Sequence, residues 1–512
     1  MEQWTNTRPA NAAPGTTHTH NGVTYVARHD AGQTVWDVDS STDPHASSLV
    51  KKFSAFNNGA GDTTSYSRCY ALIDRNDNAR VLGETRHTSI GHSHTNEWVN
   101  MPLPDGARAH EIFDKTNNIF IITTDGKCYA SGNNDHRQMA RVDGSQNSDN
   151  TLVQVNLPAD KFCKHVSIGS HDYRTAYYLM TDGSLYGAGH NPYGMCFGSG
   201  EDKGTNKNEG GPEPQLINTD VKTAYLGGRA LAGGIRNPTT WHATGYLLKH
   251  DGFVYTTGDN RYGQRGTGDI ITGVPEVYRK WHQVVQGGLI DQKITRIKVS
   301  HSHHAGTVYA LTDNNRLYSW GYNGYGQLGR GNTTSNGTPY LTATDVEDFW
   351  CPGDTHHACV WIKKTDGTVH SCGYNGFGQL GIDNTTNKST FTPVIGLPDV
   401  GTTQVESMYT SGYDTAVCVY AKTTDNRLFA CGYNGYGQLG MGHRVSVKQF
   451  TQIRLPIEPA QVRCYTSVWG NGHGAALIAG PSGELYGCGA SAYSLFDRAD
   501  NTRDFFTKVN IP

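Results

Sequence analysis

Short stretches of alternating apolar and polar residues run along most of this chain. Residues 307–312 (TVYALT) and 315–320 (NRLYSW) are two of them, and each repeats its apolar positions every second residue. A period of two is typical of a β-strand, whereas a helix would repeat every 3.6 residues. An Asp-Gly or Asp-Asn pair separates many neighbouring stretches, which is the strongest short signal for a β-hairpin. The pattern therefore predicts an all-β chain of short paired strands.

The same order of strands and turns recurs along the chain. A strand, a tight turn, a second strand, a Gly-rich bend and, in several copies, a closing strand follow one another, giving about four strands per unit. The bend reads GYNGYGQLG at 321–329 and again at 432–440, and GYNGFGQLG at 373–381. The glycines that open the bend stand 49 to 69 residues apart, at positions 83, 132, 189, 258, 321, 373, 432 and 489.

Four strands repeated at this spacing predict the blades of a β-propeller. One blade cannot bury both of its faces, whereas a closed ring of blades buries them and leaves only short protected edges. The copy around Gly83 (NARVLGE, 78–84) is degenerate, so the number of blades depends on whether it counts.

We interpret the repeated bend as scaffold. Gly324 and Gly326 fit positions with positive φ or close backbone approach, Asn323 can cap its own turn, Gln327 can satisfy backbone groups, and Tyr325 can cover a blade junction. The alternative is a repeated binding site with one ligand per blade. The structural set is Gly321, Asn323, Tyr325, Gly326, Gln327, Gly373, Asn375, Phe377, Gly378, Gln379, Gly432, Asn434, Tyr436, Gly437 and Gln438.

These bends, together with the strand pattern DG-x-apolar-aromatic-x-x-G before them, resemble the repeat of the RCC1 (regulator of chromosome condensation) family over roughly residues 49–512. The resemblance implies a seven-bladed propeller, while the eight copies in this sequence favour eight blades. The family includes a guanine-nucleotide exchange factor, a plant ultraviolet sensor and secreted bacterial inhibitors. Neither the sensor's G-W-R-H-T motifs nor a basic chromatin tail is present here, so no functional residue is transferred.

The repeat pattern divides the chain into an arm and a ring. Residues 1–48 lie outside it, and 22–38 alternate like a hairpin around Asp30-Ala31-Gly32. We expect this N-terminal β or extended arm either to close the ring by donating a strand or to dock the propeller onto a larger assembly. The propeller units are expected near 49–104, 105–158, 159–218, 219–285, 286–341, 342–398, 399–456 and 457–512.

Composition and charge narrow the possible partners. The formal charge is −3, and no Lys/Arg run offers the concentrated positive face that a nucleic acid needs. No apolar run is long enough for membrane insertion, and the residues after Met1 lack the apolar segment of a secretory signal. Export by the general secretory route is therefore not expected if Met1 is the true start.

The cysteines and histidines are expected to be structural. Cys372, Cys431 and Cys488 occupy a repeat position that Trp320 fills in another copy, which indicates buried packing and neither disulfides nor zinc. No CxxC pair occurs. Metal binding is the alternative for the histidine groups, which are His18, His20, His87, His92, His94, His171, His301, His303, His304, His356, His357 and His473. We expect no metal site and no cofactor.

Three long connections, 196–215, 228–245 and 267–292, interrupt the units. Insertions in propellers often carry binding residues. An aromatic side chain beside Arg and His can hold a sugar or a protein edge, so the candidate binding residues are Arg229, Arg236, Trp241 and His242. The alternative is a floppy loop or one that packs between subunits.

No nucleophile elbow, phosphate-binding loop or HExxH metal motif occurs, so we expect a protein that is not an enzyme. The favoured hypothesis is a structural or binding propeller of a virion: a phage tail, fibre or surface-decoration protein in an oligomeric assembly. Its partners would be neighbouring virion proteins or a host-surface protein or glycan. The alternative is a cytoplasmic RCC1-type regulator of a partner protein, such as a guanine-nucleotide exchange factor. A third hypothesis is a glycan-degrading propeller enzyme.

Overall fold

The computed structural model describes most of the chain. The described residues are 17–20, 23–30, 33–38, 49–57, 68–83, 95–104, 106–115, 118–132, 134, 137–142, 149–168, 175–189, 191, 197, 213–227, 244–271, 280–301, 306–352, 358–401, 403–413, 416–467, 473–490 and 502–511. Regular structure within these ranges is strand, apart from the 3-10 helix η6 (Leu289–Asp291). No helix in these ranges is long and apolar enough to cross a membrane.

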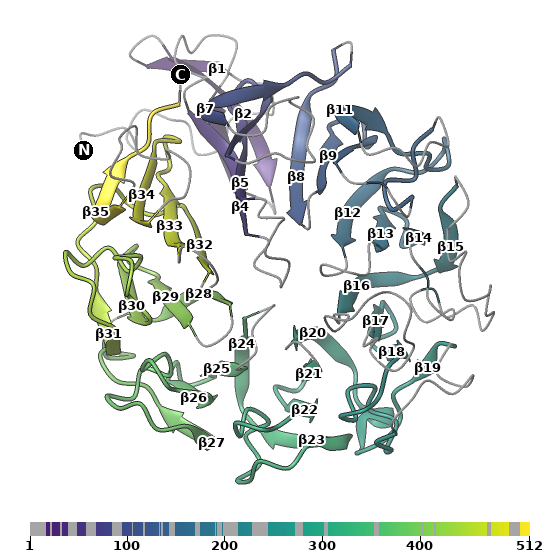
Figure 1. Cartoon of the computed structure of the whole chain (residues 1–512), viewed down its shortest axis with the longest axis vertical. Helices are drawn as coiled ribbons and strands as arrows, with labels where there is room; N and C mark the ends of the chain where they lie inside the picture. The colour runs from purple at the N-terminus through teal and green to yellow at the C-terminus, as the bar shows by residue number, and fades with distance from the viewer. Residues whose placement is uncertain are drawn as a thin grey trace.

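Eight four-stranded antiparallel sheets form a ring around a central axis (Figure 1). Blade 1 holds β4 (Val50–Asn57), β5 (Arg68–Asp74), β6 (Ala79–Gly83) and β7 (Thr95–Met101). Blade 2 holds β8 (Ala109–Lys115), β9 (Asn118–Thr123), β10 (Cys128–Gly132) and β11 (Asp149–Gln154). Blade 3 holds β12 (Cys163–Ile168), β13 (Thr175–Met180), β14 (Leu185–Gly189) and β15 (Gln215–Asn218). Blade 4 holds β16 (Val221–Gly227), β17 (Thr244–Lys249), β18 (Val254–Gly258) and β19 (His282–Gln283).

The second half of the chain continues the ring. Blade 5 holds β20 (Ile294–His301), β21 (Gly306–Thr312), β22 (Leu317–Gly321) and β23 (Asn336–Ala343). Blade 6 holds β24 (Val346–Trp350), β25 (Cys359–Lys364), β26 (Val369–Gly373) and β27 (Lys388–Pro393). Blade 7 holds β28 (Val405–Tyr413), β29 (Ala416–Thr423), β30 (Leu428–Gly432) and β31 (Val447–Gln452). Blade 8 holds β32 (Gln461–Ser467), β33 (His473–Ala479), β34 (Leu485–Ala490) and β35 (Thr502–Lys508).

The eight blades settle the count that the sequence left open. The degenerate copy contributes β6, which pairs with β5 on one side and β7 on the other, so it belongs to a complete blade. The seven-bladed ring implied by the family resemblance is wrong. In each blade the strands pair in chain order, and the first strand lies nearest the axis (Figure 1).

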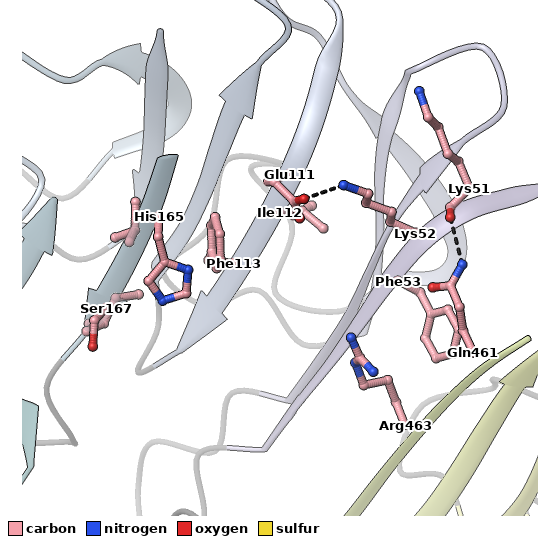
Figure 2. A pocket seen from close by; sticks show the side chains of 12 residues that line it. Lys51, Lys52, Phe53, Glu111, Ile112, Phe113, His165, Ser167, Gln461 and Arg463 are labelled. Atoms are coloured by element: carbon pink, nitrogen blue, oxygen red, sulfur yellow. Dashed lines mark hydrogen bonds and ion pairs between the residues drawn. The ribbon is translucent and has the colours of Figure 1, made fainter. Parts of the chain in front are cut away.

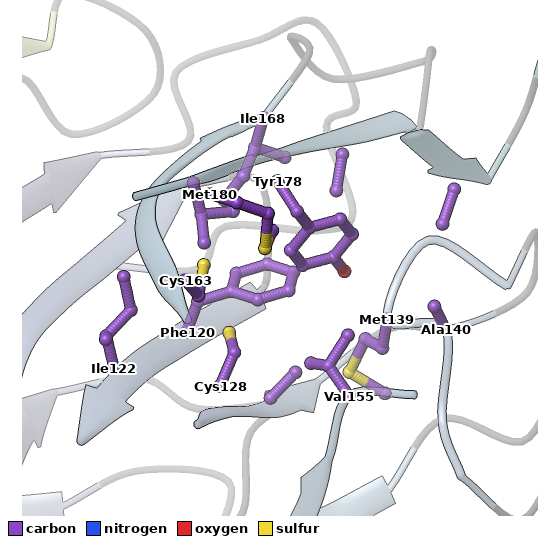
Figure 3. Packing of buried hydrophobic residues seen from close by; sticks show 14 residues of the cluster. Phe120, Ile122, Cys128, Met139, Ala140, Val155, Cys163, Ile168, Tyr178 and Met180 are labelled. Atoms are coloured by element: carbon purple, nitrogen blue, oxygen red, sulfur yellow. The ribbon is translucent and has the colours of Figure 1, made fainter. Parts of the chain in front are cut away.

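The middle strands of each blade form the core because neighbouring blades cover both faces of the sheet. Every residue of β21 and β22 is buried, whereas the outer strand β27 has no buried residue. Near-continuous apolar strands are what two-sided burial requires. Figure 3 shows one junction, where Phe120 and Cys128 of blade 2 pack with Cys163 and Tyr178 of blade 3. The Phe120 and Tyr178 rings meet edge to face, with their centroids 5.9 Å apart.

One backbone hydrogen bond recurs where blades meet. The amide of Val50, at the start of the innermost strand of blade 1, donates to the carbonyl of Gly483 in the tight turn of blade 8, at 2.8 Å. We call the face that carries these turns the turn face and the opposite one, which carries the Gly-rich bends, the corner face. The equivalent bonds join Ala109 to Asp77 (2.9 Å), Cys163 to Gly126 (2.8 Å), Val221 to Gly183 (2.8 Å), Ile294 to Gly252 (2.9 Å) and Val346 to Asn315 (2.9 Å).

The ring therefore closes with the same bond that joins blades 1 to 6 to one another. Blades 1 and 8 are each built from contiguous chain, so closure needs no strand exchanged between them. At the same junction, Phe53 and Leu72 of blade 1 belong to one buried cluster with Leu477 of blade 8 and Val509, which follows β35.

The arm forms a small sheet of its own. β1 (Thr17–His20), β2 (Val23–Asp30) and β3 (Gln33–Val38) pair in that order. Asp30 pairs with Gln33, which confirms the expected hairpin around residues 30–32. Within the described ranges these strands pair only with one another, and each blade has four strands without them. The function of the arm stays a prediction.

Candidate functional site

The buried asparagine of each of the three nine-residue bends holds two loops together. The Asn375 Oδ1 atom accepts a hydrogen bond from the Leu380 amide at 2.9 Å, and its Nδ2 donates to the carbonyls of Asn384 (2.9 Å) and Thr386 (3.1 Å). Asn323 and Asn434 make the equivalent contacts in blades 5 and 7. An amide side chain is the one neutral group that can donate and accept in this way.

The glutamine of the bend links neighbouring blades through its main chain. Its side-chain Oε1 accepts the amide of the residue two positions earlier, as Gln327 does from Tyr325 at 2.9 Å. Its carbonyl accepts the Tyr309 hydroxyl of its own blade at 2.8 Å and the Cys372 thiol of the next blade at 3.6 Å. The same link joins Trp320 to Gln264 (3.0 Å), Cys431 to Gln379 (3.4 Å) and Cys488 to Gln438 (3.1 Å).

The prediction of buried packing cysteines is confirmed for this repeat position. Cys372, Cys431 and Cys488 are buried free thiols, and burial raises the pKa of each. The hydrogen bond that each thiol donates was not foreseen, because its acceptor is a backbone carbonyl that no residue type reveals. The structural role assigned to the whole bend stays a prediction that stability measurements can test.

The glycines and aromatic residues of the bend also meet the next blade. Gly326 has φ of +81°, and a Cβ there would lie 2.6 Å from the Cα of Ser389 in blade 6. Tyr325 packs edge to face on Tyr374 of blade 6, with a centroid distance of 5.3 Å. Further contacts of this kind form a row along the corner face of blades 4 to 7, made by Tyr262, Tyr322, Tyr325, Tyr374, Phe377, Tyr433 and Tyr436.

The binding candidates taken from the long connections lie outside the described residues. Arg229, Arg236, Trp241 and His242 fall between Gly227 and Thr244, which pair with each other at the corner-face ends of β16 and β17. The histidines at 87, 92, 94, 171, 303, 304, 356 and 357 also fall outside, as do the side chains of His18, His20, His301 and His473. No group of three or more His, Cys, Asp or Glu within the described ranges could hold a metal ion.

A cavity of about 590 Å³ opens in the central channel between the innermost strands of blades 8, 1, 2 and 3 (Figure 2). The lining residues belong to β4, β8, β12 and β32. The lining consists of Lys51, Lys52, Phe53, Glu111, Ile112, Phe113, His165, Val166, Ser167, Ile168, Gln461 and Arg463. Sequence reasoning missed this site, although Lys51-Lys52, His110-Glu111 and Lys164-His165 occupy equivalent strand positions.

Basic groups outnumber acidic ones around this cavity. Lys52 forms an ion pair with Glu111, and the Lys51 Nζ atom lies 2.5 Å from Asp77 Oδ1. The exposed Arg463 donates through Nη1 to the carbonyl of Val462 at 3.0 Å and has no carboxylate partner among the described residues. Arg463 is therefore a cation of the cavity wall that no carboxylate of the described residues neutralises.

His165 forms the opposite wall of the cavity. Its ring packs edge to face on Phe113 with centroids 4.8 Å apart. Burial lowers the pKa of His165, Glu111 opposes this shift and Lys164 adds to it. The imidazole is therefore mainly neutral at pH 7 and becomes charged when an anion beside it offsets the loss of solvation.

Comparison with known proteins agrees with the repeat pattern. Residues 314–351 and 366–411 match the model of the regulator of chromosome condensation (RCC1) repeat. The chain is 26% identical over 222 residues to the ultraviolet-B receptor UVR8 of Arabidopsis thaliana, covering 42% of this chain and 45% of that protein. It is 33% identical over 136 residues to the secretion-regulating guanine nucleotide exchange factor of Bos taurus, covering 25% of this chain and 26% of that protein.

The chain thus spans less than half the length of these two relatives. Among solved structures, human WBSCR16 superposes with a TM-score of 0.52 at 18% identity, covering 73% of this chain and 89% of that structure. A likeness at this identity concerns the fold alone. Together the findings support an RCC1-repeat β-propeller with eight blades.

Proposed function

We propose that this protein is a non-enzymatic propeller that binds and regulates a partner protein. The observation that carries the proposal is the match of blades 5 to 7 to the RCC1 repeat. It is supported by the 33% identity, over 136 residues, with a protein named as a guanine nucleotide exchange factor. This was the alternative among the sequence-based hypotheses, and the comparisons favour it over the virion component.

The geometry supports a binding role on physical grounds. The asparagine and glutamine side chains of the bends form hydrogen bonds with backbone groups within the ring, so we infer that they stabilise the scaffold and do not contact a ligand. A rigid ring loses little conformational entropy on association, which makes its faces suitable for protein recognition. Around the cavity, by contrast, Arg463 remains without an acidic partner among the described residues.

The virion interpretation gains no support from the named relatives, whose names describe a light receptor and an exchange factor. The same holds for host glycans as partners. The two interpretations differ in where the native chain resides. Banding with large particles at constant stoichiometry on a density gradient would favour a virion component and overturn our proposal, whereas a freely sedimenting chain agrees with it.

Exchange-factor activity is the most specific form of the proposal and has a direct assay. Purified full-length protein is added to a panel of small GTPases loaded with fluorescent GDP, with excess unlabelled GTP. We expect faster release of GDP from at least one member, with EDTA as the positive control and heat-unfolded protein as the negative one. Unchanged release across the panel would exclude exchange activity on those GTPases.

A further inference from the structure

We propose that the cavity in the central channel is a binding site for an acidic, extended peptide segment of the partner. The inference rests on the proposed partner binding, but the site is defined by this chain's own residues. Carboxylates of the segment would meet Arg463 and Lys52, its backbone would meet the innermost strands, and its apolar atoms would lie against Phe113.

Charge is the first argument. Lys52 is paired with Glu111 and Lys51 with Asp77, while Arg463 adds a third cation that has no carboxylate partner among the described residues. The guanidinium of Arg463 is exposed and bonded only to a neighbouring carbonyl among the described groups. Figure 2 shows Arg463 on one side of the cavity, His165 and Phe113 on the other, and the Lys52–Glu111 pair between them. Arginine in a fixed fork geometry is the side chain best suited to carboxylate recognition.

Strand edges are the second argument, and they favour a peptide over a small anion. β32, β4, β8 and β12 each end their sheet, so each is paired on its outer side only and turns an unpaired edge toward the channel. Such an edge offers alternating amides and carbonyls to an added extended segment. A free phosphate or sulfate could accept from an amide of such an edge but could not pair along it, because pairing needs donors for the carbonyls as well.

Size is the third argument. A volume of about 590 Å³ lies in the range of sites that enclose a drug-sized ligand and exceeds what one inorganic anion fills. The wall is mixed: Lys52, His165 and Arg463 are polar, while Phe113 and Ile112 are apolar. Mixed walls suit a short peptide stretch that carries both carboxylates and apolar atoms.

The test measures binding of a fluorescein-labelled hexaglutamate peptide to the full-length protein by fluorescence anisotropy at low salt. We expect saturable binding, with hexalysine not binding. Unlabelled hexaglutamate should compete, whereas inorganic phosphate and ATP at equal charge concentration should compete poorly. Equal competition by phosphate or ATP would reassign the cavity to small anions, and binding of hexalysine would show that adsorption is unspecific; either result overturns the proposal.

Substitutions in the cavity wall test where the peptide binds. Arg463→Gln should weaken binding by about tenfold, the scale of one charge-assisted contact, while Arg463→Lys should retain most of it. Glu111→Gln removes the acidic group that occupies Lys52 and should strengthen binding by about fivefold. Arg316→Gln is the matched control, since Arg316 is exposed in the turn of blade 5 on the same face, outside the cavity. All variants are first compared with the parent protein by circular dichroism and thermal unfolding.

The two proposals fail separately. If the GTPase panel shows no response but hexaglutamate binding follows Arg463 and Glu111, the peptide site stands and exchange activity is excluded for that panel. If nucleotide release is accelerated and Arg463→Gln changes neither it nor hexaglutamate binding, the regulator stands and the peptide site is wrong.

Discussion

Replacing Asn375 by alanine tests whether the repeated bend is a structural joint. The side chain is fully buried, and its loss removes one accepted and two donated hydrogen bonds to Leu380, Asn384 and Thr386. If the bend were instead a repeated ligand site, the substitution would affect binding more than stability.

The expected cost follows from the groups left behind. The amide of Leu380 is buried, and an unsatisfied buried donor costs about 1–3 kcal/mol. The carbonyls of Asn384 and Thr386 belong to half-buried and exposed residues, so water can reach them and each adds only about 0.5 kcal/mol. The free energy of unfolding should therefore fall by about 2–4 kcal/mol.

Equilibrium unfolding in guanidinium chloride measures the change, followed by tryptophan fluorescence and circular dichroism to check that one transition is seen. Asn100→Ala is the matched control because Asn100 is exposed on the outer strand β7. Its effect should stay within about 0.5 kcal/mol. A loss for Asn375→Ala no larger than that of the control would refute the structural role of the bend.

Three further outcomes are expected. Gly326→Ala should destabilise the ring by about 2–4 kcal/mol through its left-handed backbone and the contact with blade 6, whereas Gly401→Ala, with no atom within 4 Å of the new Cβ, should change little; thermal unfolding compares them. Burial raises the pKa of Cys351 to about 11, so alkylation at pH 8 followed by peptide mass spectrometry should label it only after unfolding, and rapid native labelling would contradict this. Hexaglutamate affinity should rise about threefold or more from pH 8 to pH 5.5, because neutral His165 gains a proton beside the anion while glutamates stay ionised; His165→Gln should flatten the profile.

The strands and bends were predictable because their signals are local. Period-two alternation marks the strands, and the repeated nine-residue bend marks blades 5, 6 and 7. Asn323 and Gln327 make the kinds of hydrogen bond that their side chains suggest. The blade count required more than the motif, since the copy around Gly83 lacks the bend yet its strand pairs on both sides.

The cavity could not be read from the sequence for a physical reason. Its walls come from residues 51–53, 111–113, 165–168, 461 and 463, which lie in four blades and approach one another only when the ring closes. A lysine at the start of a strand is ordinarily a solvated surface residue. Only the closed ring places these four strands around a common cavity.

The seam between blades 8 and 1 has a consequence for how the chain folds. Within every blade, neighbouring strands pair in chain order, so each sheet can assemble from nearby residues soon after synthesis. The seam is different: Arg75 Nη2 meets the carbonyl of Pro481 across 406 residues at 2.8 Å, and Gln461 Nε2 meets the carbonyl of Lys51 across 410 residues at 2.7 Å. In a growing chain, blades 1 and 8 can therefore meet only after the last blade has been synthesised. Until that moment the apolar flank of blade 1 stays uncovered, so every stage before closure leaves apolar surface open to aggregation.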